Sequence, residues 1–435
     1  MQNKTFKTVI KNDKKYNILA LPGTNFFKFE IINMYGSNIE RAIEKKYNKN
    51  LYGISHFIEH LAFKSTQDFT TQEILQLGKT KGVFNASTSY DRINYWFKTT
   101  MDKLDTSISF VCNTALNDFA KINQEEFDLE KKVVFNEAKR AYDNHQQMFY
   151  RNALREVLAY HEEDNNIGVP ETIDTFTLKD AQDLKAIFLN HDKNIYNITY
   201  DSSVEDIDTI IEKIELQLQR FETPKLGEIE ISDDEYRELL KLPIDGNYKM
   251  ENDSKQAMTT ILLNSVENIL VSNATNNYLS SLAEETSLND LIREKNGLTY
   301  GIQFYTRMIS YKPYLNFSCD VTKGNESKLL ELFKESISLS AKEFTKEKYD
   351  QYTEAVSLKR TIQNLNLEAY EIWFYLDFMK SSDLDKVRDT LAIDVDEAYN
   401  FVDRNIITYE KMKASLDKVD YLVQNGKFSK VFSNE

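Results

Sequence analysis

The stretch His56-Phe57-Ile58-Glu59-His60 decides how this sequence is interpreted. On a helix, residues three and four positions apart share one face, so His56, Glu59 and His60 would point the same way. Two neutral imidazoles on one face supply half of a zinc site, and a neighbouring carboxylate can take a proton from water at the metal. The competing interpretation is a pair of surface histidines on an ordinary amphipathic helix, so the rest of the chain has to discriminate between the two.

Length and composition narrow the class of protein. With 435 residues, the chain is too long for one ordinary core and indicates two or more domains. A hydrophobic share of 41%, with only 12 Gly and 5 Pro, favours long regular elements around well-packed cores. The net charge of −15 argues against a nucleic-acid partner, because phosphate binding requires a basic surface.

The start of the chain and its cysteines bear on where the protein works. The polar segment 1–7 is not followed by an apolar signal region, and no run of about 20 apolar residues predicts a membrane-spanning helix. Cys112 and Cys319 lie far apart in apolar surroundings, which predicts buried free thiols. We therefore expect a cytoplasmic protein without a membrane partner.

Strand patterns flank the motif in the first half. Residues 16–21 and 27–34 are apolar runs separated by a Pro-Gly turn, and both predict strands. Residues 83–89 and 92–99 predict a hairpin, because apolar residues alternate along the second run.

Helical patterns complete this half. The motif helix is expected at about 52–64, with Ser55 or Asn50 as its cap. Apolar residues recur at helical spacing over 104–119, and a second long helix should begin near Glu125, where acidic residues suit the positive end of the helix dipole.

The second half repeats this order of elements. A strand is predicted at 259–263, another opens near Gly297 to Gly301, and a third spans 315–321. Helices follow at 329–337 and from 346 to about 380. The repeat predicts an α+β fold of two homologous halves, each a mainly antiparallel sheet packed with helices.

A linker candidate separates the halves. Residues 223–248 hold two of the five prolines and an acidic run. The expected division is therefore an N-terminal domain at 1–222, the linker, and a C-terminal domain at 249–435. All five histidines lie before the linker, so any metal site belongs to the first domain.

A catalytic zinc needs three protein ligands and an open position for water, so a third ligand must exist. The candidates are the remaining histidines, His145, His161 and His191, and the acids at 125, 126, 128, 130 and 137. The long helix is favoured because it is rigid and carries Glu130 and Glu137 seven residues apart, on one face. The sequence pattern alone does not decide which of these residues is the third ligand.

The segment His56-Phe-Ile-Glu-His-Leu-Ala-Phe-Lys-Ser-Thr66 resembles the metal-binding segment of the pitrilysin/insulinase family of zinc peptidases. The chain is most similar to its processing-protease branch, which includes the mitochondrial processing peptidase and bacterial homologues. Family members carry the inverted motif and a ligand glutamate on a later helix, so the resemblance implies Glu137 as the third ligand and Glu130 as a residue that supports the site. Two further segments are similar to the family, Gly82–Thr88 beside the active site and Leu291–Tyr300 in the second half.

The resemblance implies a zinc-dependent endopeptidase with one Zn²⁺ per chain. His56, His60 and Glu137 would hold the metal, and Glu59 would act as general base and then as proton donor to the leaving amine. Substrate-binding roles are implied for residues of both halves, namely Asn85, Ala86, Arg293 and Tyr300.

The implied substrates are short or unstructured peptides, including precursor or leader peptides. The expected assembly is a homodimer, or a heterodimer with a homologous chain, in which two chains face each other as a clamshell. Two alternatives compete with this hypothesis. One is a non-catalytic or partner-dependent subunit that holds peptide, and the other is a hydrolase of a non-peptide substrate. The intact set of His56, Glu59, His60 and Glu137 argues against the first, and nothing in the sequence supports the second.

Overall fold

The structure is a computed structural model whose described residues fall into two compact units. The units comprise Met1–Asp143 with His161–Tyr236, and Asn144–Tyr160 with Arg237–Glu435. The described residues are 5–33, 35–89, 92–144, 148–149, 151–153, 166–189, 194–221, 246–250, 256–264, 269–281, 285–309, 312–363 and 407–433. The three alternative ligands His145, His161 and His191 lie outside them, as do residues 223–245 of the expected linker.

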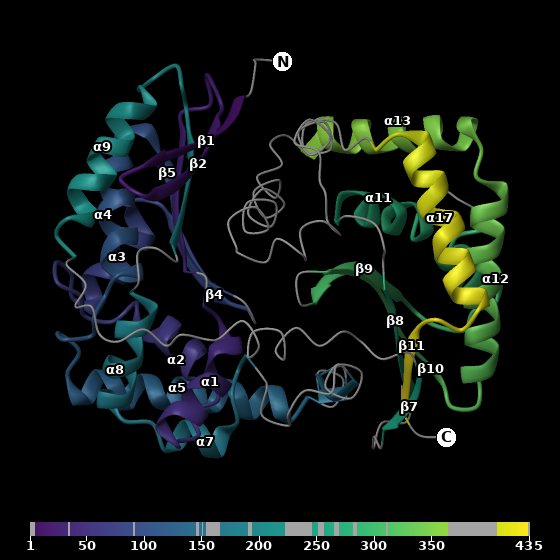
Figure 1. Ribbon diagram of the computed structural model, residues 1–435, viewed down its shortest axis with the longest axis horizontal. Helices are drawn as coiled ribbons and strands as arrows, with labels where there is room; N and C mark the ends of the chain where they lie inside the picture. Colours follow the sequence, from purple (N-terminus) through teal and green to yellow (C-terminus); the bar gives the residue numbers. More distant parts are fainter. Residues whose placement is uncertain are drawn as a thin grey trace. The chain divides into compact units, whose positions relative to one another are not determined.

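A six-stranded sheet forms the framework of the first unit (Figure 1). Its strands are β1 (Thr5–Lys11), β2 (Lys14–Ala20), β3 (Phe26–Asn33), β4 (Val83–Thr88), β5 (Ile93–Thr100) and β6 (Asn194–Tyr200). Their order is β1-β2-β6-β3-β5-β4, and every neighbouring pair is antiparallel except β2 and β6. The four strands expected from the sequence are therefore present, while β1 and β6 were not foreseen.

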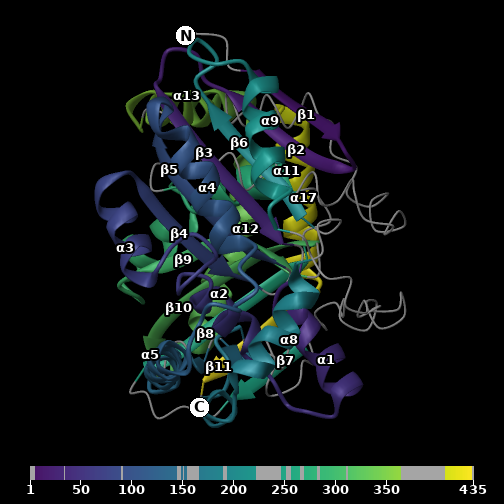
Figure 2. The same ribbon diagram turned by 90° about the vertical axis from the view of Figure 1, so that its left-hand side faces the viewer.

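Some helices of this unit pack on one face of the sheet, and others lie beyond its end (Figure 1). They are α1 (Glu40–Tyr47), α2 (Ile54–Leu61), α3 (Thr71–Thr80), α4 (Leu104–Ala115), α5 (Gln124–Tyr142), α7 (Pro170–Asp174), α8 (Leu178–Phe188) and α9 (Ile207–Leu218). In Figure 2, α4 and α9 run side by side over the strands, and α4 contacts β3 and β5. The core-facing residues of β3 alternate as expected for a strand, with Phe27, Phe29 and Ile31 all buried against the helices.

One helix ends earlier than predicted. The apolar spacing over 104–119 predicted a single helix through Phe119, but α4 ends at Ala115. Phe119 has a positive φ of 65° and therefore cannot continue a right-handed helix, although its side chain remains fully buried. Phe119 thus fits the apolar pattern because it is buried, although it is not part of the helix.

The second unit repeats the first sheet with one strand fewer. Its strands are β7 (Gly246–Met250), β8 (Gln256–Asn264), β9 (Ile302–Ile309), β10 (Lys312–Thr322) and β11 (Ser429–Ser433). The order β7-β11-β8-β10-β9 matches β2-β6-β3-β5-β4, and the parallel pair recurs as β7 and β11. The prediction of two homologous halves of α+β type is therefore confirmed.

The helices of the second unit also follow the first. They are α11 (Ile269–Leu279), the π-helical turn η4 (Asn289–Lys295), α12 (Glu326–Glu343), α13 (Lys346–Gln363) and α17 (Tyr409–Gln424). The strand expected to open at Gly297 begins at Ile302, and the last residues of the expected linker, 246–248, belong to β7. Residues 364–380 of the predicted long helix lie outside the described residues.

Two further sequence expectations can be compared with the structure. Cys112 and Cys319 are both buried free thiols, as predicted. Within the described part of the chain, no helix is long and apolar enough to cross a membrane.

Candidate metal centre

The motif helix α2 begins at a close contact between two glycines. Gly53 precedes the helix with a φ of +94°, which is accessible to glycine at low cost. A Cβ on Gly53 would lie 2.4 Å from the Cα of Gly168, and Gly168 itself has a φ of +77°. Neither position tolerates a side chain without movement, so the glycines fix where the helix starts.

A buried carboxylate caps this helix from outside it. Glu40 accepts hydrogen bonds from the backbone N–H of Gly53 and of Ser55, both at 2.8 Å. The expected caps were wrong, because the N-cap position of α2 is occupied by Gly53 rather than by Ser55 or Asn50. Asn50 accepts from the N–H of Tyr52, and Ser55 donates to the carbonyl of Gly36 at 3.1 Å. A carboxylate suits this position because it faces the positive end of the helix dipole.

The long helix α5 crosses the motif helix. Asn123 and Glu126 form a capping box at its start, which satisfies two of the unpaired N–H groups there. The two helices are held together by aromatic packing, since the rings of Phe57 and Phe127 meet edge to face with centroids 5.2 Å apart. Phe57 is therefore buried in this contact, and the neighbouring residues His56 and His60 face the acids of α5.

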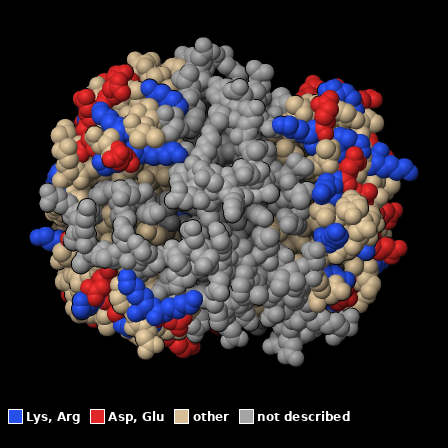
Figure 3. All heavy atoms as spheres, viewed as in Figure 1, with Lys and Arg blue, Asp and Glu red and all other residues tan. Residues whose placement is uncertain are grey.

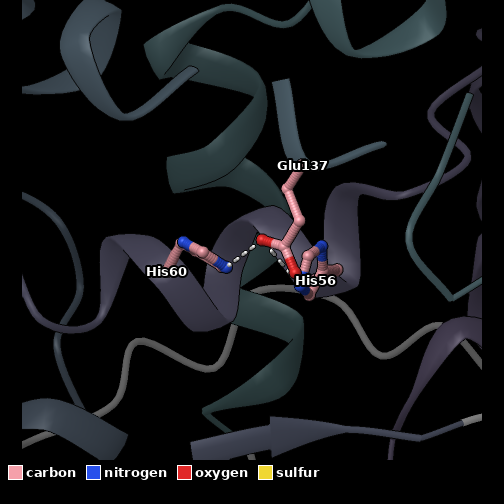
Figure 4. Close-up of side chains that lie close together, drawn as sticks. All are labelled: His56, His60 and Glu137. Carbon is pink, nitrogen blue, oxygen red and sulfur yellow. Dashed lines mark ion pairs between the residues drawn. The ribbon is translucent and has the colours of Figure 1, made fainter. Parts of the chain in front are cut away.

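Three potential ligand atoms converge between these helices. Glu137 projects from α5 toward the two imidazoles of α2, as Figure 4 shows. Its Oε2 lies 3.3 Å from Nε2 of His60 and 4.0 Å from Nε2 of His56. Single ligand atoms from the three residues all lie within 4.8 Å of one another. The structure thus brings together the three residues that the sequence proposed as ligands.

The donor set fits zinc. Two imidazole nitrogens and one carboxylate oxygen are a known catalytic combination, with bond lengths of about 2.0–2.2 Å. At tetrahedral angles such bonds place ligand atoms roughly 3.3–3.5 Å apart. The Glu137–His60 separation of 3.3 Å matches this value, whereas the Glu137–His56 separation of 4.0 Å is longer. The side chains of His56, His60 and Glu137 are 13%, 22% and 33% exposed, so the site is reachable from solvent.

Glu130 orients His60 from the other side. Its Oε1 lies 2.8 Å from Nδ1 of His60, and its second oxygen pairs with Lys64. With the proton on Nδ1, His60 donates to Glu130 and leaves the lone pair of Nε2 for a metal. Burial opposes the charge of Glu130, but the contacts with His60 and Lys64 outweigh it and hold the pKa of this carboxyl below its usual value.

The surrounding carboxylates also act on His60. Burial alone would lower the pKa of its imidazole, but Glu130, Glu59 and Glu137 together raise it. The ring is therefore held in a strongly negative environment, and a bound cation would relieve the mutual repulsion of the carboxylates.

Glu59 lies beside the three candidate ligands and is 9% exposed. Thr88, at the end of β4, donates a hydrogen bond of 2.7 Å from Oγ1 to Oε2 of Glu59. Burial is the main reason that the pKa of Glu59 is raised, and the charge of Glu137 adds to it. A carboxylate with a raised pKa is better suited to accept a proton near neutral pH.

The other predicted site residues lie on β4 and in the second unit. Strand β4 is at the edge of its sheet, where Asn85 is exposed and Ala86 is buried. In the second unit, Tyr300 is 95% exposed and Arg293 stacks over its ring at 5.8 Å. Arg293 also pairs with the neighbouring Glu294 at 3.3 Å.

Sequence reasoning missed three residues that shape the site. Lys64 lies beyond the end of α2 at Leu61, so helical spacing does not connect it with His60. Thr88 could have been found from strand alternation, which places residues 84, 86 and 88 on the same face of β4. Glu40 carried no such signal, because its contact with the start of α2 depends on the path of the chain between them.

Comparisons with known proteins identify related families and relatives. The family "Insulinase (Peptidase family M16)" matches residues 45–171, and "Peptidase M16 inactive domain" matches residues 195–356. The zinc protease PqqE of Helicobacter pylori is 31% identical over 178 residues, which cover 40% of this chain and 38% of that protein. An uncharacterized zinc protease of Rickettsia bellii is 26% identical over 173 residues, 38% of this chain and 39% of its own length. The chain therefore spans about two fifths of these relatives.

Solved structures share the fold over the whole chain. A protease from Helicobacter pylori superposes with a TM-score of 0.71 at 18% identity and covers all of both chains. The periplasmic protease PqqL from Escherichia coli gives a TM-score of 0.64 at 15% identity, and the match covers all of this chain but 48% of that one.

Proposed function

We propose that this chain, which belongs to the insulinase (M16) family of peptidases, is a zinc-dependent endopeptidase of short or unstructured peptides. The observation that carries the proposal is the convergence of His56, His60 and Glu137 within 4.8 Å, with the buried Glu59 beside them. Such a group combines a metal site with a proton acceptor, as metal-assisted hydrolysis of a peptide bond requires. Several relatives are named zinc proteases, which supports the same chemistry.

Each residue has a defined role in this proposal. His56 and His60 hold one zinc ion per chain through neutral Nε2 atoms, Glu137 supplies a carboxylate oxygen, and Glu130 keeps His60 in the required tautomer. When bound, zinc polarises a carbonyl and lowers the pKa of water. Glu59 accepts the proton of the attacking water and returns it to the leaving amine, and Thr88 fixes the carboxylate in place.

The substrate would bind as an added strand. The free edge of β4 offers backbone hydrogen bonds to an extended peptide next to Asn85 and Ala86, which gives affinity without strict sequence demands. Arg293 and Tyr300 would contribute contacts to substrate carbonyls and to the developing oxyanion. In this proposal residues 1–222 are the catalytic domain, and residues 249–435 supply substrate contacts.

A second candidate is a partner-dependent or non-catalytic subunit. It is favoured by the match to an inactive M16 domain, and by the similarity to a structure titled as an M16 inactive domain from Pseudomonas fluorescens. However, the inactive-domain match begins at residue 195, whereas all four proposed ligand and base residues lie within the match to the peptidase family at 45–171. This distribution supports activity in the first half of the chain.

Assembly and location are predictions of the same proposal. The chain matches about half of the PqqL structure, so a second homologous chain, identical or not, would supply the missing half. Size-exclusion chromatography with mass measurement distinguishes a homodimer from a chain that requires a partner. The cytoplasmic location expected from the sequence can be checked by cell fractionation.

The decisive experiment is zinc-dependent cleavage of a quenched fluorescent peptide library by the purified chain. We expect cleavage that is lost with a chelator and restored by zinc. Glu59→Gln should retain zinc and lower the rate by about a thousandfold or more, since general-base removal costs this order. Full activity in that variant would refute the mechanism. No cleavage by the unmodified chain, alone and with a homologous partner, would favour the non-catalytic alternative.

A further inference from the structure

A cavity with mainly apolar walls, flanked by lysine side chains, lies at the far end of the β4–β5 hairpin. Its volume is about 460 Å³, within the range of small-ligand sites. Three lysines line it together with aromatic and aliphatic side chains, and we call it the lysine pocket: Lys81, Lys98, Lys103, Trp96, Val83 and Phe26. The strand pairing places Phe26 opposite Thr100 and Val83 opposite Lys98, so these residues share the face of the sheet opposite the helices.

The lysines of this pocket are incompletely neutralised. Among the described residues, no carboxylate lies within ion-pair distance of Lys81 or Lys98. Lys103 faces the exposed Asp102 at 3.4 Å. Burial above all, and then the charge of Lys28, lowers the pKa of Lys98, and Glu30 offsets this only in part because it pairs with Lys28 at 2.9 Å. An anion bound in the pocket would therefore be attracted by lysine charge that the carboxylates of the described residues do not fully neutralise.

Trp96 gives the pocket an aromatic wall. The ammonium of Lys98 lies 4.4 Å from the centre of its ring, and that of Lys28 lies 5.7 Å away. These contacts hold the cations along the wall of the cavity rather than extended into solvent. The pocket can thus accept a side chain that has both an apolar stem and a negative end.

The pocket is continuous with the proposed substrate strand. Val83, at the start of β4, is 61% exposed and lines the pocket, and the alternate residues Asn85 and Ser87 are exposed as well. Thr88, at the other end of β4, bonds Glu59. Val83 and Thr88 are five residues apart along β4. At about 3.3 Å per residue, the pocket lies roughly 17 Å along the strand from the residue that bonds Glu59.

We propose that the lysine pocket binds an acidic segment of the peptide substrate, about five residues from the bond that is cleaved. This inference rests on the proposed function, since it takes the edge of β4 as the substrate strand. Charge complementarity favours an acidic occupant. The chain as a whole carries a net charge of −15, and acidic and basic side chains are intermingled on the face drawn in Figure 3. The three lysines around this cavity therefore form a local positive site in an acidic protein, and an acidic peptide can bind there.

A peptide fits this pocket better than a nucleic acid does. Binding to a phosphate backbone requires an extended basic surface that follows the strand. The lysine pocket is instead a single cavity at the end of a strand edge, in an acidic protein. We therefore take an oligonucleotide as the competitor that the experiment must include.

Tryptophan fluorescence measures this binding without any cleavage. The chain has two tryptophans, so Trp373→Phe leaves Trp96 as the reporter inside the pocket. The full-length chain with Glu59→Gln and Trp373→Phe is titrated with a peptide of about ten residues that carries a run of Glu at one end, and with the same peptide carrying Gln. We expect the Glu peptide to bind about fivefold to tenfold more tightly at low salt, with the preference shrinking toward about 0.15 M salt.

Matched variants locate the effect. The double change Lys81→Gln with Lys98→Gln should remove the preference for Glu, while Lys121→Gln, an exposed lysine outside the pocket, should leave it intact. Equal binding of both peptides, or an unchanged preference in the double variant, would overturn the proposal. A single-stranded oligonucleotide that binds more tightly and displaces the peptide would overturn it too.

The outcomes separate the two proposals. Selective binding of the Glu peptide without any cleavage by the unmodified chain would support the lysine pocket and count against the peptidase. Cleavage that ignores an acidic segment at every position of a peptide series would support the peptidase and refute the role of the pocket.

Discussion

The two units build the same sheet but use its equivalent helices differently. Helix α2 follows β3 in the first unit, and α11 follows β8 in the second. On α2, His56, Glu59 and His60 face the acids of α5. On α11, the polar side chains serve packing instead, since Thr275 bonds Ser415 at 2.9 Å and Asn276 donates to the carbonyl of Phe304 at 3.0 Å.

The long helices show the same contrast. At an offset of 222 residues, Glu130 of α5 corresponds to Tyr352 of α13. Glu130 contacts His60 on the motif helix, and Tyr352 donates to the carbonyl of Ala274 on α11 at 3.2 Å. A contact between the two helices is thus present in both units. The contact described here joins a carboxylate to an imidazole in the first unit and a phenol to a backbone carbonyl in the second. The shared fold brings the two helices together in both units, and the side chains at their contact determine whether a metal site can form there.

Removal of the third ligand should have the largest effect on this contrast. Glu137→Gln replaces a carboxylate oxygen by a weaker neutral donor, so we expect zinc affinity to fall by about a hundredfold or more. Metal content after dialysis against a graded chelator, by elemental analysis, measures it. Lys359→Gln, at the equivalent position of α13, is the control and should leave the zinc content unchanged. Full zinc retention in Glu137→Gln would remove this residue from the ligand set.

The equivalent contacts made by Glu130 and Tyr352 can be removed one at a time and their effects compared. Glu130→Gln should lower zinc affinity about tenfold to a hundredfold, because His60 loses its charged partner while the helices still pack. Tyr352→Phe should leave zinc affinity unchanged and cost about 1 kcal/mol of unfolding free energy, the value of one hydrogen bond. Isothermal titration with zinc and calorimetric unfolding distinguish these outcomes. A loss of zinc affinity in Tyr352→Phe would contradict the division of roles.

The smallest expected effect concerns acid stability of the first unit. The buried Asp201 accepts backbone hydrogen bonds from Gly23 at 2.7 Å and Asn25 at 2.6 Å, and it also bonds Ser203. Burial would raise the pKa of Asp201, but these hydrogen bonds lower it to about 2 from an ordinary 3.8. The stabilisation is therefore fully present above about pH 4 and is lost as the pH falls through 2.

Asp201→Asn tests this pH dependence. At pH 7 we expect the variant to lose about 1–2 kcal/mol of unfolding free energy, and the difference from the unmodified chain should shrink as the pH approaches 2. If the two units unfold separately, only the transition of the first unit should shift in scanning calorimetry. A difference that stays constant between pH 7 and pH 2 would show that the charge of Asp201 is not the cause.

Much of the fold followed from local patterns. Strands β3 and β5 and helix α5 lie within a few residues of their predicted bounds. A local signal marked each of them: an apolar run after a turn for β3, alternating apolar residues for β5 and an acidic first turn for α5. Strand β6 was missed although it pairs with both β2 and β3. A strand in the middle of a sheet is buried on both faces and shows no alternation, so its pairing depends on residues distant in the chain.

The site divides in the same way. The spacing of His56, Glu59 and His60 is a property of one helix and was therefore visible in the sequence. Thr88 and Glu40 act on that helix from other elements, at 2.7 Å and 2.8 Å. Strand alternation shows which face of β4 Thr88 shares, but not that Glu59 lies against that face. The lysine pocket is another such case, since Lys81, Lys98 and Lys103 come together only because β4 pairs with β5.

The sequence by itself determined the duplicated α+β order, the restriction of histidine to the first half, and the pair of imidazoles on one helical face. Only the tertiary structure decided that Glu137 reaches both imidazoles, that Thr88 and Glu130 hold the reacting groups, and that a cavity flanked by lysines lies at the far end of β4. The physical reason is the distance along the chain over which residues interact. Periodicity within one element records what that element buries, whereas contacts between elements depend on how the whole core packs.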